Sequence, residues 1–396
     1  MNTLPMGDKH ELKNEEFFNR TSELSALSAL LNSTKESNAP DILLTGIRGV
    51  GKTVFLKKLK RDLEEDYLIL YLDFSRAECY QKSNMSVEGL IEFYYKELIK
   101  ECKSKGLNTF DKQIEKFFKT NNFKIRNFGN VNSFPIPIID KETDTEDLIN
   151  FVMELPDKIF KENKEKIKGV LIFIDEFQII KELNDYLESF LWKFRSFIQE
   201  QSNVAYILSG SMSLQDRLIA EIASHGGVFG GRMITFHLNP FTKNTVKNYL
   251  NEKAPNLILT ENAFERFYNC TSGIPAYINY FGRLLPKDIE LTENDISSEF
   301  IDAIPVLSIQ LISIWSKLTS REQDIIISLL NGPIRRIDIA NHVGVTTGSL
   351  SHSLNNLQNQ GLVTLENNMY ELTEPMLSRW LKLEYEKKGI YPYKRI

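Results

Sequence analysis

The chain has 396 residues, of which 42% are hydrophobic and 26% are charged, and its net charge is −5. These proportions are typical of a globular protein, and the length allows two or three domains with a sizeable core. The slightly acidic balance excludes a general attraction to nucleic acid or to anionic membranes, so any such contact would need a local basic face.

The cysteines and the apolar runs indicate a compartment. Cys79, Cys102 and Cys270 are too widely spaced for a metal motif, and their scatter predicts a reducing environment. The first residues are polar and lack the apolar core of a signal peptide. Apolar runs such as Val170 to Ile180 are too short to span a bilayer. We therefore expect a cytoplasmic protein without a membrane partner.

The segment before the first strand combines a polar start with a helix. Residues 1–16 are polar, and we expect them to be poorly ordered. Thr21 or Ser22 can cap a helix that carries leucines on one side. The stretch from Asn32 to Pro40 is rich in Ser, Asn and Pro, which predicts the end of that helix.

The stretch GIRGVGKT matches the phosphate-binding pattern G-x-x-x-x-G-K-[ST] at every fixed position. A buried strand is predicted before it, over residues 41–45, and a helix after it, over residues 54–63. Backbone N–H groups of such a loop cradle phosphates, and the helix N-terminus adds a partial positive charge. Lys52 is predicted to reach the β- and γ-phosphates, and the Thr53 hydroxyl to bind Mg²⁺. The predicted nucleotide-binding residues of the loop are Gly46, Ile47, Arg48, Gly49, Val50, Gly51, Lys52 and Thr53.

The alternative to a phosphate site is a chance glycine-rich turn, and the flanking strand and helix argue against it.

A second buried strand is predicted over residues 67–74. Residues 81–166 are then mostly helical by pattern. Within them, the alternating residues 123–138 with a central Gly-Asn predict a small hairpin outside the main sheet.

Residues 170–177 form the second informative run. Five apolar residues precede Asp175 and Glu176, which predicts a fully buried strand with two carboxylates at its C-terminal end. Ligands of parallel α/β sheets bind at that end of the strands. Asp175 is predicted to hold the hydration shell of Mg²⁺, and Glu176 to orient and deprotonate the attacking water. The alternative is an acidic strand end that only begins a loop.

Two further polar positions follow. The strand predicted over residues 204–210 ends in Ser209, which can contact the γ-phosphate or the attacking water, while Ser211 can instead cap a helix. Arg232 follows the glycine-rich stretch His225 to Gly231 and precedes a strand, which is a suitable place for an arginine finger. A surface arginine is the alternative reading of Arg232.

The order of strands and helices predicts an α/β fold of the P-loop NTPase type, with a parallel sheet wound on both faces. Residues 239–290 are helical by pattern and predict a small lid over the nucleotide. The stretch Thr271 to Pro275 breaks two of these helices, and Pro275 suits a first helical turn.

The remainder predicts three helices and a hairpin with Asn367 and Asn368 at its tip, which together make a winged helix-turn-helix. The third helix, from Thr346 to Gln360, exposes Ser, His, Asn and Gln but no Lys or Arg. Asn and Gln can read bases, whereas phosphate binding normally needs Lys or Arg. Cations nearby are Arg335, Arg336, Lys387, Lys388, Lys394 and Arg395. Contact with DNA and contact with protein therefore both stay open.

With these motifs in place, the chain resembles the archaeal-type ATPases of the STAND/AAA+ group, the MNS clade. The resemblance covers Phe17 to about Lys382. It rests on seven pieces: Phe18-Asn19-Arg20, GIRGVGKT, Leu171 to Glu176, Ser209-Gly-Ser211, Gly231-Arg232, Gly273-Ile-Pro275, and Tyr370 to Trp380. It implies hydrolysis of ATP coupled to a conformational switch. It also implies that residues 17–31, with Asn19 and Arg20, pack near the adenine, and that Pro275 lies in a nucleotide-sensing lid.

The expected organisation has four parts: a flexible N-terminus (1–16), an ATPase domain (17–240) with an insertion (81–166), a helical lid (241–310), and a winged-helix domain with its tail (311–396). The expected function is a Mg²⁺-dependent ATPase switch. The alternatives are a nucleotide-gated DNA-binding regulator and a protein-binding scaffold with little turnover. No guanine-specific Asn-Lys-x-Asp motif is present, and the resemblance favours ATP. If Arg232 acts in trans, the chain must also self-associate.

Overall fold

The structure is a computed structural model that describes residues 4–5, 12–13, 16–109, 124–127, 135–138, 145–210, 218, 222 and 228–393. Several sequence expectations lie outside the described residues. They concern most of residues 1–16, the Gly-Asn tip of the small hairpin, Ser211, the start of the glycine-rich stretch before Arg232, and the tail cations Lys394 and Arg395.

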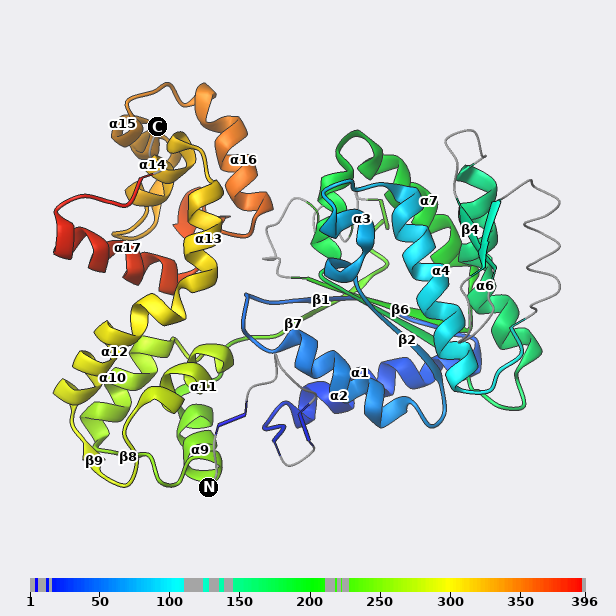
Figure 1. Cartoon of the computed structure of the whole chain (residues 1–396), viewed down its shortest axis with the longest axis horizontal. Helices are drawn as coiled ribbons and strands as arrows, with labels where there is room; N and C mark the ends of the chain where they lie inside the picture. Colours follow the sequence, from blue (N-terminus) through cyan, green and yellow to red (C-terminus); the bar gives the residue numbers. More distant parts are fainter. Residues whose placement is uncertain are drawn as a thin grey trace.

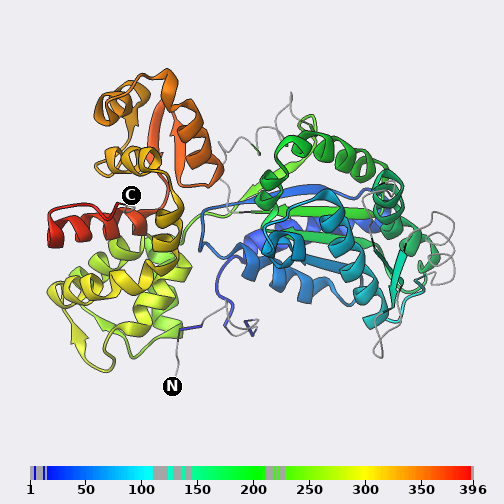
Figure 2. The same ribbon diagram turned by 45° about the horizontal axis from the view of Figure 1, so that its top comes forward.

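A five-stranded parallel sheet forms the centre of the N-terminal part (Figures 1 and 2). Its strands, in spatial order, are β2 (Leu68–Asp73), β5 (Val170–Asp175), β6 (Val204–Ser209), β1 (Asp41–Thr45) and β7 (Ile234–His237). All neighbouring pairs are parallel, so the carboxyl ends of the strands lie at one edge. The register sets Asp73 beside Asp175 and Leu44 beside Ser209.

Helices cover both faces of this sheet (Figure 1). One face packs against α1 (Thr21–Asn32) and α2 (Lys52–Leu63), and the other against α4 (Val87–Ser104), α6 (Thr145–Glu162) and α7 (Leu187–Glu200). Strand β5 is fully buried and alternates between the two cores, with Leu171 and Phe173 on the first face and Ile172 and Ile174 on the second. The predicted sheet wound on both faces is therefore confirmed.

The excursion between β2 and β5 contains the predicted hairpin. Strands β3 (Lys124–Asn127) and β4 (Pro135–Ile138) pair antiparallel, with Lys124 opposite Ile138. The short elements that connect the N-terminal part are η1 (Ser33–Glu36), η2 (Phe74–Arg76), α3 (Glu78–Gln81) and η3 (Phe177–Tyr186).

The helices after the sheet form a second body. Its first part, for which we keep the name lid as a label only, contains α9 (Lys243–Lys253), β8 (Ile258–Leu259), α10 (Glu261–Thr271), α11 (Pro275–Leu284), β9 (Glu290–Leu291) and α12 (Glu293–Leu307). The C-terminal region contains α13 (Ile309–Lys317), α14 (Ser320–Ser328), β10 (Ile334–Arg335), α15 (Arg336–Val343), η4 (Gly348–Leu350), α16 (Ser351–Asn359), β11 (Val363–Glu366), β12 (Met369–Leu372) and α17 (Pro375–Lys388). Strands β11 and β12 form the second predicted hairpin, and Asn367 and Asn368 at its tip both have positive φ angles.

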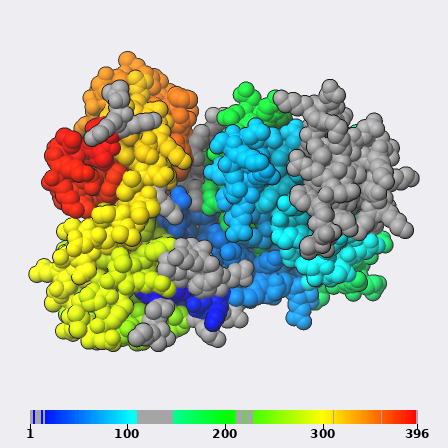
Figure 3. Space-filling view, in the orientation of Figure 1, coloured from blue at the N-terminus to red at the C-terminus, as the bar shows by residue number. Residues whose placement is uncertain are grey.

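The lid and the C-terminal region share one apolar core. A single cluster of buried side chains runs from Phe241 to Leu383, and Trp315 and Trp380 meet in it with ring centroids 6.2 Å apart. Figure 3 shows the two regions as one continuous block of yellow-green to red atoms beside the blue to green atoms of the N-terminal part. The two regions are therefore packed together as one unit.

Leu4, from the stretch expected to be poorly ordered, is buried in this same core. Its side chain is 2% exposed and packs at Gly282 of α11, and its carbonyl accepts a hydrogen bond from the Arg283 guanidinium. The Leu12 carbonyl accepts one from Arg61 on α2. The described residues of the N-terminus thus contact both bodies of the molecule.

No single helix in the described residues is long and apolar enough to cross a bilayer. Only the bent pair Glu293–Leu307 and Leu311–Lys317, taken together, meets the criteria of length and composition.

Candidate nucleotide-binding site

The phosphate loop connects β1 to α2 at the carboxyl edge of the sheet. Gly46, Gly49 and Gly51 all have positive φ angles, which only glycine adopts without strain. A Cβ atom at Gly46 would also lie 2.7 Å from the Leu238 carbonyl oxygen. The glycines therefore allow the backbone of the loop to curl back over the start of α2.

Lys52 is held inside this loop. Its ammonium group donates to the carbonyl oxygens of Gly46 at 2.7 Å and Ile47 at 3.1 Å, and the side chain is 6% exposed. Burial, aided by the charge of Arg48 and opposed by the charges of Glu176 and Asp175, lowers the pKa of Lys52 to about 8. Bound phosphates would replace the carbonyl oxygens as partners and would favour the charged amine.

Asp175 meets Thr53 across the end of the sheet. The Thr53 hydroxyl donates to Asp175 Oδ2 at 2.6 Å, and the Tyr71 hydroxyl donates to the same oxygen at 2.9 Å. Hydroxyl and carboxylate oxygens are ligands that Mg²⁺ accepts, and this ion usually takes only one or two from protein beside phosphates and water. No group of three or more metal-ligating side chains occurs among the described residues. The pair fits a Mg²⁺ ion that is shared with a nucleotide.

Glu176 follows Asp175 in a left-handed conformation, with φ at 54°, and lines the cavity beside the loop. Gln178 donates a hydrogen bond of 2.5 Å to its carboxylate. Burial raises the pKa of Glu176, and the neighbouring charge of Asp175 raises it further, while Gln178, Lys52 and Arg48 oppose the rise. A carboxylate with a raised pKa is better suited to accept a proton from water near neutral pH.

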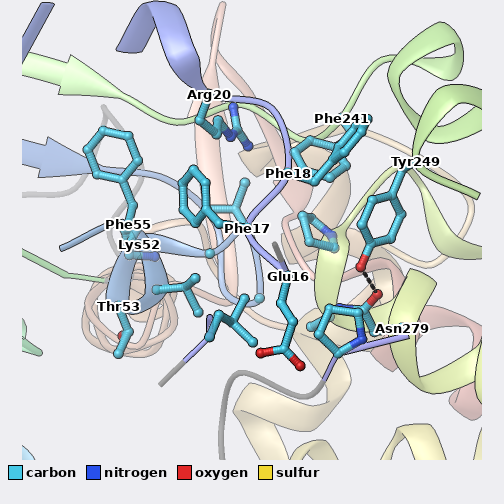
Figure 4. A pocket seen from close by; sticks show the side chains of 18 of the residues that line it. Glu16, Phe17, Phe18, Arg20, Lys52, Thr53, Phe55, Phe241, Tyr249 and Asn279 are labelled. Atoms are coloured by element: carbon cyan, nitrogen blue, oxygen red, sulfur yellow. Dashed lines mark hydrogen bonds between the residues drawn. The ribbon is translucent and has the colours of Figure 1, made fainter. Parts of the chain in front are cut away.

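A cavity of about 310 Å³ opens between the phosphate loop, the N-terminal segment and the lid (Figure 4). Its end near the loop is polar and contains Lys52 and Thr53. Its other end is lined by aromatic side chains that pack on one another, with ring centroids 5.0 Å apart for Phe18 and Tyr249 and 6.0 Å apart for Phe241 and Tyr249. A phosphorylated ligand with a flat apolar group matches this polarity.

The lid contacts the phosphate loop directly. Pro275 occupies the first turn of α11, and the next residue, Ala276, donates its backbone N–H to the Gly49 carbonyl oxygen at 3.2 Å. The first N–H groups of a helix have no partner within the helix, so they are free to bind the loop. Pro275 lines the cavity.

Arg20 lines the cavity, but its guanidinium is already engaged. It donates to the Asn239 carbonyl oxygen, pairs with Glu23 at 3.3 Å and lies over the Phe241 ring at 5.0 Å. Burial lowers the pKa of Arg20, whereas Glu23 raises it. Asn19 precedes it with φ at 60° and does not line the cavity.

Ser209 and Arg232 do not line the cavity either. Ser209 lies at the carboxyl end of β6, between the strands that carry Asp175 and the phosphate loop. Its side chain is fully buried, and its hydroxyl has no hydrogen-bond partner among the described residues. Arg232 is exposed just before β7, so the structure does not bring it to the other predicted site residues.

Several cavity residues were not identified from the sequence. Tyr249 and Asn279 lie on two separate lid helices, and Glu16 precedes the first helix. Tyr71, which bonds Asp175 and was also missed, lies on the edge strand β2 and outside the cavity lining. One available signal was the spacing of Pro275 and Asn279, which places both on one face of a helix.

Fold and site together define a P-loop nucleotide-binding protein. Residues 17–281 match the family described as an ATPase domain predominantly from Archaea, and the chain belongs to this family. The matched range covers the phosphate loop, Glu176 and the start of α11, so it includes the sheet and the lid residue that contacts the loop.

Named relatives agree with this assignment. The chain is 24% identical over 274 residues to an uncharacterized ATP-binding protein of Methanocaldococcus jannaschii, covering 66% of this chain and 68% of the relative. A second such protein from that organism is 22% identical over 354 residues, 83% of each chain. The solved structure of a Walker-type ATPase of Pyrococcus abyssi has a TM-score of 0.64 and 20% identity, over 94% of this chain and 98% of that one.

Proposed function

We propose that this ATP-binding protein hydrolyses ATP with Mg²⁺ and uses hydrolysis to switch the position of the lid and the C-terminal region. The observation that carries the proposal is that the carboxyl end of β5 and the lid both contact the phosphate loop. Thr53 at the end of the loop bonds Asp175, and Gly49 within the loop bonds the first turn of α11.

The residues divide the chemistry among them. Lys52 would neutralise the charge on the β- and γ-phosphates, and Thr53 with Asp175 would hold the metal ion. Mg²⁺, when bound, supplies charge neutralisation at the phosphate oxygens. Glu176, with its raised pKa, would accept a proton from the attacking water. Gln178 fixes the direction of the Glu176 carboxylate.

A hydrogen-bonded connection leads from the loop to the C-terminal region. Tyr277 follows Ala276 on α11, and its hydroxyl donates to Glu374 Oε1 at 2.6 Å. Glu374 caps α17 by accepting the backbone N–H of Met376 at 3.2 Å. A change in the phosphate loop therefore has a short route to the N-terminus of α17.

Phosphate release from ATP tests the proposal. Lys52→Ala and Glu176→Gln should each reduce release by at least a hundredfold, because each removes a group that acts on the transition state. Matched controls are Lys57→Ala on the same helix and Glu182→Gln on the exposed part of η3, which should retain activity. Release that survives both site substitutions would overturn the proposal.

A second candidate function is a nucleotide-gated DNA-binding regulator. Helices α14, α15 and α16 with the β11–β12 hairpin follow the order of a winged helix-turn-helix, and α16 exposes Ser351, His352 and Asn355. Against this, Arg336 is engaged by the Thr347 carbonyl oxygen and by Ser351. Mobility shifts with duplex DNA at low salt, in ATP and in ADP, decide the matter. Absence of binding in both would favour a protein partner instead.

A further inference from the structure

We propose that Asn279, held in place by Tyr249, selects adenine by donating a hydrogen bond to ring nitrogen N1 of the base. The inference rests on the proposed use of ATP at this same site, and it assigns the specificity for the base to one side chain of the lid. Three features of the cavity lead to it: the position of Asn279, the state of its amide oxygen, and the apolar surroundings.

The position of Asn279 follows from the geometry of α11. The helix is fixed to the phosphate loop at Ala276, and Asn279 lies one turn further along. Residues three positions apart share a helix face, so a helix that presents Ala276 to the loop presents Asn279 to the adjoining space. Asn279 accordingly lines the cavity on the side away from Lys52 (Figure 4).

Tyr249 determines which amide atom Asn279 can offer. The Tyr249 hydroxyl donates to Asn279 Oδ1 at 2.6 Å (Figure 4), and the tyrosine side chain is 3% exposed. Burial raises the pKa of Tyr249, so the hydroxyl keeps its proton and remains a donor. This bond turns Oδ1 toward Tyr249 and occupies one of its two acceptor positions, and the amide nitrogen, which donates to no described side chain or carbonyl, can then donate to a ligand.

The surroundings make this donor selective. Phe18, Phe241 and Tyr249 form an apolar wall beside Asn279 that suits the flat faces of a purine. In such surroundings an unmatched polar group loses its hydration without compensation. Adenine offers an acceptor at N1, whereas guanine in the same pose offers an N–H donor that would face the N–H of Asn279. The site would therefore bind ATP more tightly than GTP.

Binding of four ligands to the full-length protein by calorimetry tests the inference: ATP, GTP, 1-deaza-ATP and inorganic tripolyphosphate. Loss of a single hydrogen bond should weaken ATP binding to Asn279→Ala by about three- to tenfold, with tripolyphosphate binding unchanged. 1-Deaza-ATP lacks the N1 acceptor. It should bind the wild type about three- to tenfold more weakly than ATP, and it should bind Asn279→Ala as tightly as ATP.

Asn279→Asp gives a gain of affinity that a misfolded variant could not give. Its carboxylate would accept the N1–H of guanine and repel the N1 lone pair of adenine, so the preference should move toward GTP by at least tenfold. Tyr249→Phe should weaken the preference for ATP without reversing it. Asn248→Asp adds the same charge at an exposed position of α9, outside the cavity lining, and should leave the preference as in the wild type.

Unchanged ratios of ATP, GTP and 1-deaza-ATP binding in both Asn279 variants would overturn the inference. Because the assay measures binding, it separates this failure from that of the proposed hydrolysis. A protein that binds with the expected ratios but releases no phosphate supports base selection by Asn279 and contradicts only the ATPase proposal.

Discussion

Tyr277 and Glu374 are 97 residues apart in the sequence, and the hydroxyl of the first donates a 2.6 Å hydrogen bond to the carboxylate of the second. The two side chains join the helix that contacts the phosphate loop to the N-terminus of the last helix. Burial raises the pKa of Glu374, while the bonds from Tyr277 and Met376 oppose that rise. These two hydrogen bonds therefore stabilise the charged form of the buried Glu374 carboxylate.

Tyr277→Phe should separate nucleotide binding from its effect on the C-terminal region. Loss of one donor to a buried carboxylate should lower the free energy of unfolding by about 1–3 kcal/mol, as judged by urea denaturation. ATP should still bind, but it should no longer alter the protease sensitivity of α17. The exposed Tyr385→Phe serves as a control. An ATP-dependent cleavage pattern like that of the wild type would refute the connection.

Gly49→Ala should weaken nucleotide binding through the lid. Its φ angle is 79°, and an added Cβ would lie 3.0 Å from Ala276 Cβ and 3.1 Å from Ile274 Cγ2. Gly344→Ala is a matched control, because Gly344 has a φ angle of 72° but no atom within 4 Å of the added Cβ. Both variants should lose about 1 kcal/mol of stability from backbone strain. Only Gly49→Ala should lose ATP affinity, by about tenfold in calorimetry, since it alone displaces α11.

Asp41 should make stability depend on pH. Burial at the start of β1 raises the pKa of Asp41 to about 7, above its ordinary value of 3.8. The folded state therefore binds this proton more tightly than the unfolded state. The associated stability is complete below about pH 4 and is lost as the pH rises through about 7.

The measurement is urea denaturation of Asp41→Asn at pH 4 and at pH 8. Asp41 is only half-buried, so at pH 8 we expect the variant to be more stable than the wild type by about 1–2 kcal/mol, with a much smaller difference at pH 4. Asp302→Asn, at an exposed position of α12, provides the control. An equal effect of Asp41→Asn at both pH values would contradict the assignment.

In this conformation Arg232 is exposed and lies outside the cavity of its own chain. It can therefore act as an arginine finger only on a nucleotide bound to a second molecule. The specific ATPase activity of the wild type should then rise with protein concentration, and Arg232→Ala should abolish that rise. Arg321→Ala, at another exposed position, should behave like the wild type. Full activity of Arg232→Ala at every concentration would show that Arg232 is a surface residue without a role in hydrolysis.

The sequence was most informative where neighbouring residues carry the signal. The glycines and Lys52 predicted the phosphate loop, and the apolar run before Asp175 predicted a buried strand beside it. The pairing of Thr53 with Asp175 fits the predicted metal site, because parallel strands bring their carboxyl ends to one edge.

The opposite wall of the cavity could not be predicted in this way. Tyr249 and Asn279 meet only because two lid helices pack together, and Glu374 reaches Tyr277 only through the shared core of the lid and the C-terminal region. Such contacts depend on tertiary packing, which leaves no periodic pattern in either segment. Ser209 shows the converse limit, since its place at a strand end did not bring its hydroxyl into the cavity.

The buried position of Leu4 bears on which part of the chain forms a self-sufficient unit. The family match begins at residue 17, yet Leu4 fills a space beside Gly282 in the core of the lid. A fragment cut to the matched residues 17–281 would leave that space empty and would also lose Glu374, the partner of Tyr277. The packed core that contains the lid therefore extends beyond the matched residues on both sides.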